Sequence, residues 1–255
     1  MLASQRQNQI RALLHQNGAV TIAGLMQTFG ISMETARRDL AAMEKDGLLT
    51  RVHGGALPLT TAHFYRPLRE RMQDRLVQKQ AIARAAASMV NEGDYIAISG
   101  GSTAVAFAHA LRARIHRLTV ITYSVDVFET LRDMPHYTVM LTGGKYHPRE
   151  RAFQGPAVAA FLSGVCMQKA FLFPAVLSLE DGCTCLTEEL VRRLTPMIRN
   201  SDQVFVLADS TKFEHKIRYQ VTPMRQDFIY ITDAGLPEAL QKKYADHHLR
   251  FIYAQ

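Results

Sequence analysis

The stretch Tyr95-Ile96-Ala97-Ile98-Ser99-Gly100-Gly101-Ser102-Thr103 sets the fold class of most of this chain. Its first five residues are apolar or small and form a short run that is typical of a buried strand. Two glycines and two hydroxyl residues follow, and the pattern from Ala104 to Leu111 then predicts a helix. The stretch is therefore expected to be a strand, a tight turn and a helix, which is the repeating unit of a sheet covered by helices.

Similar apolar runs alternate with helical patterns along the rest of the chain. The strand candidates are Tyr95 to Ser99, Leu118 to Thr122, Thr138 to Thr142, Ala170 to Phe173, Val204 to Ala208 and Phe228 to Thr232. Such alternation predicts an α/β fold with a mainly parallel sheet and helices on both faces. Because ligands of such folds bind beyond the carboxyl ends of the strands, we expect a small-molecule site there.

Glycines, hydroxyls and cations gather at four of these strand ends. The turn from Ser99 to Thr103, together with the first amides of the following helix, predicts a phosphate cradle. The turn Thr142-Gly143-Gly144-Lys145 adds flexibility and a cation, Thr122-Tyr123-Ser124 adds hydroxyls, and Lys212 in Asp209-Ser210-Thr211-Lys212-Phe213 can neutralise phosphate charge. Each turn alone also fits a simple loop or cap, so the prediction rests on their occurrence together.

The first 57 residues carry a different pattern. Residues 5 to 16 predict one helix, Thr21 can cap a short second helix, Gly30 permits a tight turn, and Ser32 can cap a third helix. Two short helices joined by a glycine-containing turn are typical of the helix-turn-helix, whose second helix enters the major groove of DNA. The third helix carries an apolar stripe of Ala36, Leu40 and Met43.

The start of the third helix holds the candidate DNA-reading residues, which are Ser32, Met33, Thr35, Ala36, Arg37 and Arg38. Arginine can bond two guanine acceptors or a phosphate, and Thr or Ala can pack on a thymine methyl. The segment from Leu48 to Leu57 predicts a wing of two extended pieces, with Arg51 and His53 as its contacts. The alternative is a small helical bundle in which the arginine pair is only a solvated face.

A linker rich in Thr and Ala separates this N-terminal region from the rest. We expect a DNA-binding domain at 1–57, a linker at 58–66 and a second domain at 67–255. From Arg66 to Arg84 six cations face two acids, which predicts a solvent-facing helix, with attraction for DNA as the second interpretation.

Composition narrows the class of protein. A formal charge of +7 on 255 residues favours a polyanionic partner, although its placement matters more than its total. Neither a secretion signal nor a run of about 18 apolar residues occurs, so we expect a cytoplasmic protein. The cysteines Cys166, Cys183 and Cys185 are expected to be reduced and packed, because their spacing fits neither a disulfide framework nor a zinc site. We expect no metal and no cofactor.

The N-terminal motifs resemble those of the DeoR family of bacterial transcription regulators. The resemblance rests on Ile31-Ser32-Met33-Glu34-Thr35-Ala36-Arg37-Arg38-Asp39-Leu40, on Glu44 to Leu48 and on Arg51 to Ala56. It continues through Lys169 to Phe171 and Gly182 to Glu189, and so extends from Arg6 to Asp233. It implies a winged helix-turn-helix followed by a sensor domain similar in fold to ribose-phosphate isomerases.

The resemblance also implies which residues border an effector pocket. In the family these are the glycine-hydroxyl loop, the Gly-Gly turn, an acid near Glu188–Glu189 and the lysine. The implied set here, with the neighbouring strand ends, is Ser99, Gly100, Gly101, Ser102, Thr103, Thr122, Tyr123, Gly143, Gly144, Lys145, Glu188 and Lys212. The chain departs from the family at Ser99, where an acid is usual, and at Thr122–Tyr123, where Thr-Asn is common.

Together these expectations predict a repressor of a sugar or nucleoside catabolism operon. We expect a homo-oligomer that binds operator DNA and is released by a phosphorylated sugar, with activation as an open alternative. Tyr123–Ser124, Cys183 to Cys185 and Arg250 to Tyr253 resemble the deoxyribonucleoside-operon branch, which implies deoxyribose 5-phosphate as the effector.

Two rival functions remain open at this point. One is an isomerase-like enzyme that carries a DNA-binding extension, with Glu188 or Asp209 as its general base. The other is a redox sensor that uses Cys183 and Cys185, although cysteines two residues apart rarely form an unstrained disulfide.

Overall fold

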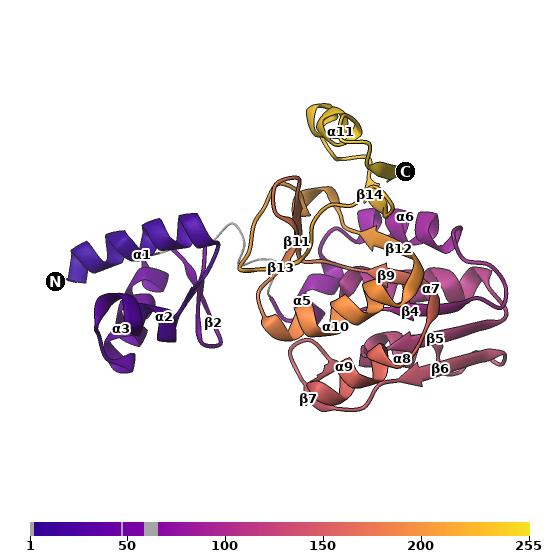
Figure 1. The fold of residues 1–255 in the computed structure, drawn as a ribbon, viewed down its shortest axis with the longest axis horizontal. Helices are drawn as coiled ribbons and strands as arrows, with labels where there is room; N and C mark the ends of the chain where they lie inside the picture. The colour runs from indigo at the N-terminus through magenta and orange to yellow at the C-terminus, as the bar shows by residue number, and fades with distance from the viewer. Residues whose placement is uncertain (1–2, 47, 59–65) are drawn as a thin grey trace.

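The N-terminal region is a three-helix unit with a small sheet (Figure 1). The computed structural model describes residues 3–46, 48–58 and 66–255. The N-terminal elements are α1 (Ala3–Asn17), β1 (Val20–Thr21), α2 (Ile22–Phe29), α3 (Met33–Lys45), β2 (Thr50–Val52) and β3 (Gly55–Leu57). The three helices and the wing are confirmed, whereas the two-residue strand β1, which pairs with β3, is too short to leave a pattern in the sequence.

Helix caps and one apolar core hold this unit together. Thr21 Oγ1 accepts a hydrogen bond from the Gly24 amide at 3.0 Å, and Ser32 Oγ accepts one from the Thr35 amide at 3.2 Å. Such caps satisfy amides that a helix start leaves without partners. The core brings together α1, α2, α3 and the sheet through Ile10, Leu14, Val20, Leu25, Ala36, Leu40, Met43, Leu49 and Ala56.

The larger part of the chain is a three-layer α/β unit. Its elements are α5 (Leu68–Gln73), α6 (Leu76–Ala87), β4 (Tyr95–Ile98), α7 (Ser102–Arg114), β5 (Leu118–Thr122), α8 (Val125–Leu131), β6 (Tyr137–Leu141), β7 (Lys145–His147), β8 (Ala152–Gln154), α9 (Pro156–Ser163), β9 (Met167–Leu172), β10 (Val176–Ser178), β11 (Gly182–Cys185), α10 (Glu188–Arg199), β12 (Ser201–Leu207), η2 (Ser210–Lys212), β13 (Tyr219–Thr222), β14 (Ile229–Asp233), α11 (Glu238–Ala245) and β15 (Arg250–Ala254).

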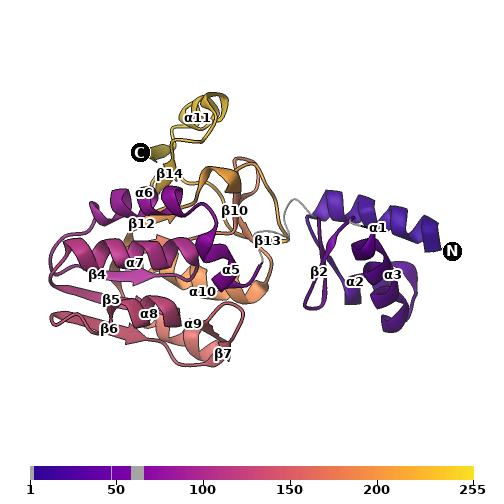
Figure 2. The same ribbon diagram turned by 180° about the vertical axis from the view of Figure 1, so that it is seen from behind.

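Seven parallel strands form the central sheet in the order β15-β14-β12-β9-β4-β5-β6. The six strand candidates all lie in it, and β15 is a further strand at its edge. One core lies between the sheet and α6, α7 and α8, which face the viewer in Figure 2, and a second core lies on the side of α9 and α10. The prediction of a mainly parallel sheet covered on both faces is confirmed.

The prediction of one solvent-facing helix from Arg66 to Arg84 is wrong. The chain forms two helices, α5 and α6, which meet at Arg75 in a left-handed conformation with φ of +48°. An alanine-rich face of α6, including Ala83 and Ala86, packs in the core beside α7, and Lys79 is only 3% exposed. Alanine packs closely without a large side chain, which explains why a weakly periodic helix is buried.

The cysteines are free thiols, and two of them are buried. Cys183 and Cys185 lie in β11, while Cys166 is exposed, contrary to the expectation that all three are packed. Burial raises the pKa of Cys183 to about 12 and that of Cys185 to about 11. Because the thiolate is the reactive form, this chemistry disfavours a redox sensor at Cys183 and Cys185.

Within the described ranges, no helix combines the length and apolarity that crossing a membrane requires. The linker boundary at 58–66 stays a prediction, since residues 59–65 lie outside the described residues.

Candidate DNA-binding surface and effector site

The start of α3 presents an open, positively charged surface. Met33 is 48% exposed, and Arg37 and Arg38 are exposed one helical turn further on. The Ser32 and Thr35 hydroxyls form a hydrogen bond with each other at 2.9 Å, so both already take part in the helix cap. Arg37 and Arg38 form no ion pair with an acid in the part of the chain that the structure describes, which leaves both guanidinium groups available to an anion.

Ala36 is misplaced in the predicted set of DNA-reading residues. Its side chain is fully buried in the core beside Leu40 and Met43. The apolar stripe and the reading face of one helix are different faces, and Ala36 belongs to the stripe. It therefore positions α3 and does not contact a base.

The wing is a short hairpin of β2 and β3 that turns at His53 and Gly54. Gly54 has φ of +82°, a conformation that favours glycine. The Arg51 and His53 side chains are exposed at this hairpin, as a DNA contact requires. The Arg51 amide donates to Glu44 Oε1 at 2.7 Å, which ties the wing to the end of α3.

A buried ion pair that sequence reasoning missed fixes α3 against α1. Arg6 donates from Nε to Asp39 Oδ2 at 2.5 Å and from a terminal nitrogen to Asp39 Oδ1 at 3.0 Å. Arg6 is 9% exposed and Asp39 4%. The two-point contact sets the rotation of α3, because a planar guanidinium holds a carboxylate in one orientation.

The sheet has its topological switch point between β4 and β9. From β4 the chain builds β5 and β6 on one side, and from β9 it builds β12, β14 and β15 on the other. A crevice forms where two such halves diverge, and ligands of open α/β sheets bind there. The turns after β4, β9 and β12 therefore define the candidate effector site.

The Gly100–Gly101 turn fits a cradle for an anion. Gly101 has φ of +141° and precedes the first residue of α7, whose leading amides are not part of the helical ladder. A Cβ at Gly100 would lie 3.1 Å from the Tyr123 ring, a tight contact that favours glycine there. Within the described residues, the buried Thr103 and Thr142 hydroxyls have no hydrogen-bond partner. Buried polar atoms without partners are uncommon and indicate a site for a ligand or water.

Ser99 serves the fold at this turn. It is 1% exposed, and its hydroxyl accepts a hydrogen bond from the Phe173 amide at 3.1 Å. The contact joins the ends of β4 and β9 at the switch point. Ser99 thus shapes the crevice, and because its hydroxyl keeps a proton to donate, its predicted contact with an effector stays a prediction.

Lys212 lies at the crevice on η2, after β12. Its ammonium donates to the Pro174 carbonyl at 3.4 Å, in the turn after β9. Burial lowers the pKa of Lys212, with the Asp209 carboxylate opposing the shift. Burial alone raises the pKa of Asp209, but Lys212, hydrogen bonds from Thr211, and Arg75 outweigh it, so that the pKa lies below its ordinary value.

Three further cations surround this site, and the sequence analysis did not place them there. Arg75 Nε lies 3.6 Å from Asp209 Oδ1, Arg71 pairs with Glu150 at 2.5 Å, and the Lys79 ammonium donates to the carbonyls of Arg71 and Asp74. Burial lowers the pKa of Lys79 to about 8, with repulsion from Lys212, Arg71 and Arg66, and with Asp209 opposing. Arg71 lies on α5, Lys79 on α6 and Arg75 at the break between the two helices, so a helical period in the sequence could not reveal this cluster.

Asp233 completes the cluster from the end of β14. It accepts hydrogen bonds from the Ser210 amide at 2.7 Å and from the Ser210 hydroxyl at 3.0 Å. One of its oxygens lies 3.9 Å from an Arg75 nitrogen. Two acids therefore hold η2 and Arg75 in place around Lys212.

Glu188, the acid predicted to border the effector site, faces solvent. Its side chain is 62% exposed and pairs with Arg192 at 2.8 Å on the outer face of α10. The neighbouring Glu189 turns inward and accepts a hydrogen bond from the Gly155 amide at 2.7 Å. One residue corresponds to about 100° around a helix, which is enough to exchange the solvent face for the packed face.

The remaining predicted residues lie on β5 and in the turn after β6. Thr122 accepts from the Ser124 amide at 3.1 Å, and Tyr123 is 2% exposed beneath the Arg193 guanidinium, 4.5 Å from its ring centre. Gly144 has φ of +131°, and Gly143, Gly144 and Lys145 are exposed where β7 begins. Their part in an effector site stays a prediction.

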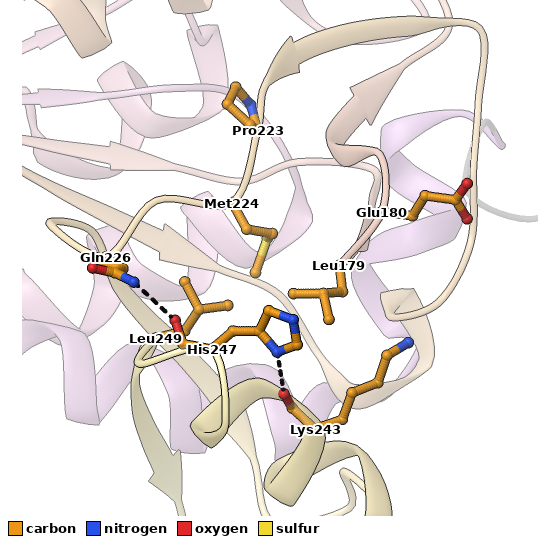
Figure 3. A pocket seen from close by; sticks show the side chains of 8 residues that line it. All are labelled: Leu179, Glu180, Pro223, Met224, Gln226, Lys243, His247 and Leu249. Carbon is orange, nitrogen blue, oxygen red and sulfur yellow. Dashed lines mark hydrogen bonds between the residues drawn. The ribbon is translucent and has the colours of Figure 1, made fainter.

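A separate cavity lies near α11, away from every predicted effector residue (Figure 3). It has a volume of about 510 Å³ and is lined by residues that include Leu179, Met224, Lys243, His247 and Leu249. His247 bonds the Lys243 carbonyl through Nδ1 at 2.9 Å. The cavity is open and uses none of the cations at the switch point.

Comparison with known proteins agrees with this geometry. Residues 6–62 match the family model of the DeoR-like helix-turn-helix domain, and residues 74–234 match that of the DeoR C terminal sensor domain. The chain is 31% identical over 248 residues to the HTH-type transcriptional regulator GolR of Listeria innocua, covering 96% of each protein. It is 34% identical over 222 residues to the lactose phosphotransferase system repressor of Lactococcus lactis, covering 84% of each.

A solved structure of ribose 5-phosphate isomerase A from Neisseria gonorrhoeae is a remote match. It has a TM-score of 0.39 and 17% identity over 54% of this chain and 53% of that one, which is too distant to carry an argument. The relatives above are named regulators or repressors, and both parts of the chain match regulator domains. The protein is a DNA-binding transcription regulator rather than an enzyme, and it belongs to the DeoR family.

Proposed function

We propose that this regulator represses a sugar or nucleoside catabolism operon and that a phosphorylated sugar at the β4/β9 crevice releases it from operator DNA. The start of α3 and the wing contact the duplex. The Gly100–Gly101 turn, the first amides of α7 and Lys212 receive the phosphate group.

The observation that carries the effector proposal is the unbalanced charge around Lys212. Arg75 lies 3.6 Å from Asp209 and 3.9 Å from Asp233, while the pKa of Lys79 is lowered to about 8 mainly by burial and further by repulsion from Lys212. Positive groups held close together repel one another, and this repulsion lowers a lysine pKa. A bound phosphate dianion would offset the excess charge and would find the helix amides beside it.

The DNA proposal depends on Arg37 and Arg38 of α3 and on Arg51 and His53 of the wing, all of which are exposed. A single winged helix buries little surface, and two linked copies bind two half-sites far more tightly than one. We therefore propose a homo-oligomer that is assembled outside the winged helix.

The sugar class is proposed from chemistry and relatives. One relative is named for a lactose phosphotransferase system, which supports a sugar effector. The resemblance at Tyr123–Ser124 and Cys183 to Cys185 makes deoxyribose 5-phosphate the first compound to test.

A ligand screen by thermal shift tests the proposal. Deoxyribose 5-phosphate, other sugar phosphates, the same sugars without phosphate, and inorganic phosphate are each added to the purified chain and to Lys212→Ala. A sugar phosphate that binds the folded state raises the melting temperature of the parent protein. We expect a rise with at least one sugar phosphate, none with its unphosphorylated sugar, and a loss of the rise in Lys212→Ala. Equal shifts in the parent and the variant would contradict the proposed site.

A further inference from the structure

A small apolar contact joins the winged helix to the sensor domain. It consists of Ala19 and Leu57 from the winged helix and of Val176 and Ile217 from the sensor domain, and we call these four residues the hub. Each hub residue is at most 6% exposed. Val52, Ala175 and Leu186 pack around them.

The backbones of the two parts also meet at the hub. Gly18, directly after α1, has φ of +65°, and a Cβ added there would lie 2.6 Å from the Lys216 carbonyl oxygen and 3.1 Å from Ile217 Cα. Such an approach requires glycine on both counts. In both views the C-terminal end of α1 and the strand β2 lie toward β13, and α3 lies on the far side of the winged helix (Figures 1 and 2). The contact therefore leaves the DNA-reading face open.

Two short segments connect the hub to the proposed effector site. Pro174, whose carbonyl accepts from Lys212, lies two residues before Val176 of the hub. Lys212 itself lies five residues before Ile217. A ligand that moves Lys212 or the turn after β9 therefore acts on both sensor residues of the hub.

The segments are also tied to one another by a bridge and to the small sheet by hydrogen bonds. Phe213 forms a bridge with Leu177 of β10, the His215 amide donates to the Leu177 carbonyl at 3.4 Å, and the Ile217 amide donates to Thr184 Oγ1 at 3.0 Å. Both segments lead into the small sheet β10-β11-β13, which is separate from the seven-stranded sheet.

We propose that the hub is the switch through which the sensor domain controls DNA binding. Without effector, the small sheet holds the winged helix in the docked position that suits the operator. Effector binding at Lys212 shifts this sheet and loosens the hub, which lowers operator affinity. The inference rests on the proposed function for its ligand step, whereas the docked contact itself is testable without a ligand.

The direct test compares Ala19→Glu with Ala12→Glu. Ala19 belongs to the hub rather than to the core of α1, α2 and α3, whereas Ala12 is exposed on α1, so both variants add one negative charge but only the first breaks the hub. Fluorescence anisotropy measures the affinity of each full-length variant for the operator, with and without deoxyribose 5-phosphate. We expect Ala19→Glu to bind operator about 5- to 150-fold more weakly than Ala12→Glu, the range of typical allosteric coupling, and to respond no further to ligand.

A second pair of variants tests the hub in case Ala19→Glu fails to fold. Gly18→Ala and Gly30→Ala carry the same backbone strain, because φ is +65° at one position and +62° at the other, but only Gly18 faces the sensor domain. Peptide hydrogen exchange over residues 175–186 and 213–218 should rise in Gly18→Ala and stay at the parent level in Gly30→Ala.

The outcomes separate the two proposals. If operator affinity is equal in Ala19→Glu and Ala12→Glu, or if exchange is unchanged in Gly18→Ala, the hub does not control DNA binding. If no sugar phosphate alters operator binding of the parent protein while Ala19→Glu still weakens it, the proposed effector is wrong and the hub stands.

Discussion

The cations on α3 and the cations at the switch point carry the same charge but differ in exposure and in their partners. Arg37 and Arg38 are exposed, and no described acid pairs with them. Lys79 is 3% exposed, and Lys212 and Arg75 are held by carbonyls and by carboxylates at the ends of β12 and β14. The first set is open to a long anion that approaches from solvent. The second set is arranged around one small anion and is already partly neutralised.

This difference explains how one chain can bind two anionic partners, a DNA duplex and a small phosphate ligand. Exposed arginines on a helix gain affinity from a duplex because they displace its counterions, and they keep their hydrated state when no duplex is present. Buried cations need fixed partners at all times, because an unpaired buried charge is costly. The two sites can therefore be altered one at a time, and the predictions below use that independence.

The largest effect is expected from the structural pair that orients the DNA-reading arginines. Asp39→Ala leaves Arg6 buried without its carboxylate, and removing one partner of a buried pair costs about 3–5 kcal/mol. Urea unfolding of the winged helix should show this loss. An Asp46→Ala control, at an exposed position after α3, should unfold like the parent. A loss below about 1 kcal/mol in Asp39→Ala would show that the pair does not hold α3.

At the effector site, Lys212→Ala should abolish the release from operator DNA that the sugar phosphate causes. Operator affinity without ligand should stay intact. The substitution removes a charged donor that is half-buried beside Asp209, and charge-assisted hydrogen bonds are worth about 1.5–3 kcal/mol. Sugar-phosphate affinity, measured by calorimetry, should fall about 10- to 150-fold on that basis. Arg69→Ala, an exposed cation on α5, is the matched control. Preserved release in Lys212→Ala would remove Lys212 from the site.

On the DNA side, Arg37→Ala and Arg38→Ala should each weaken operator binding without changing ligand affinity. Loss of a base-reading arginine costs about 1–3 kcal/mol, whereas loss of a phosphate contact weakens binding to all sequences alike. Anisotropy at fixed salt, with operator and random duplexes, separates the two roles. Arg84→Ala, exposed on α6, should change neither affinity. No effect from either α3 arginine would mean that another surface reads the DNA.

The smallest effect is a pH dependence that only the buried cations should show. Lys79 has a pKa lowered to about 8, so it is charged at pH 7 and loses its proton as the pH rises through 8. A bound phosphate favours the charged form, so ligand affinity should be highest near pH 7 and fall by up to about tenfold by pH 9. The phosphate is mainly a dianion between pH 7 and pH 9, so its own titration adds little to this change. Lys79→Arg should flatten the profile, and an unchanged slope in that variant would exclude Lys79 as its source.

Local chemistry made much of this architecture predictable. The apolar runs from Tyr95 and from Leu118 become parallel strands, and the caps Thr21 and Ser32 with Gly30 mark helix ends, because these signals act over a few residues. The turn at Gly100 and the position of Lys212 after β12 follow from the same patterns.

The features that the sequence did not reveal depend on contacts that form only in the folded chain. Lys79 is buried because the Arg71 and Asp74 carbonyls receive its ammonium, and the solvent-facing pattern of its helix gives no sign of this. Glu188 and Glu189 differ only in rotation around α10, which depends on packing against Gly155. The hub joins residues about 120 to 200 positions apart in the chain, so no local pattern reveals it.

Operator affinity in the presence and absence of a sugar phosphate tests the central claim most directly. The full-length chain is titrated against labelled duplexes from its own promoter region and against random duplex at physiological ionic strength, with and without deoxyribose 5-phosphate. We expect one promoter duplex to bind at least about 10³-fold more tightly than random duplex, and the sugar phosphate to reduce that preference. Equal binding to promoter and random duplexes, unaffected by any sugar phosphate, would contradict the account.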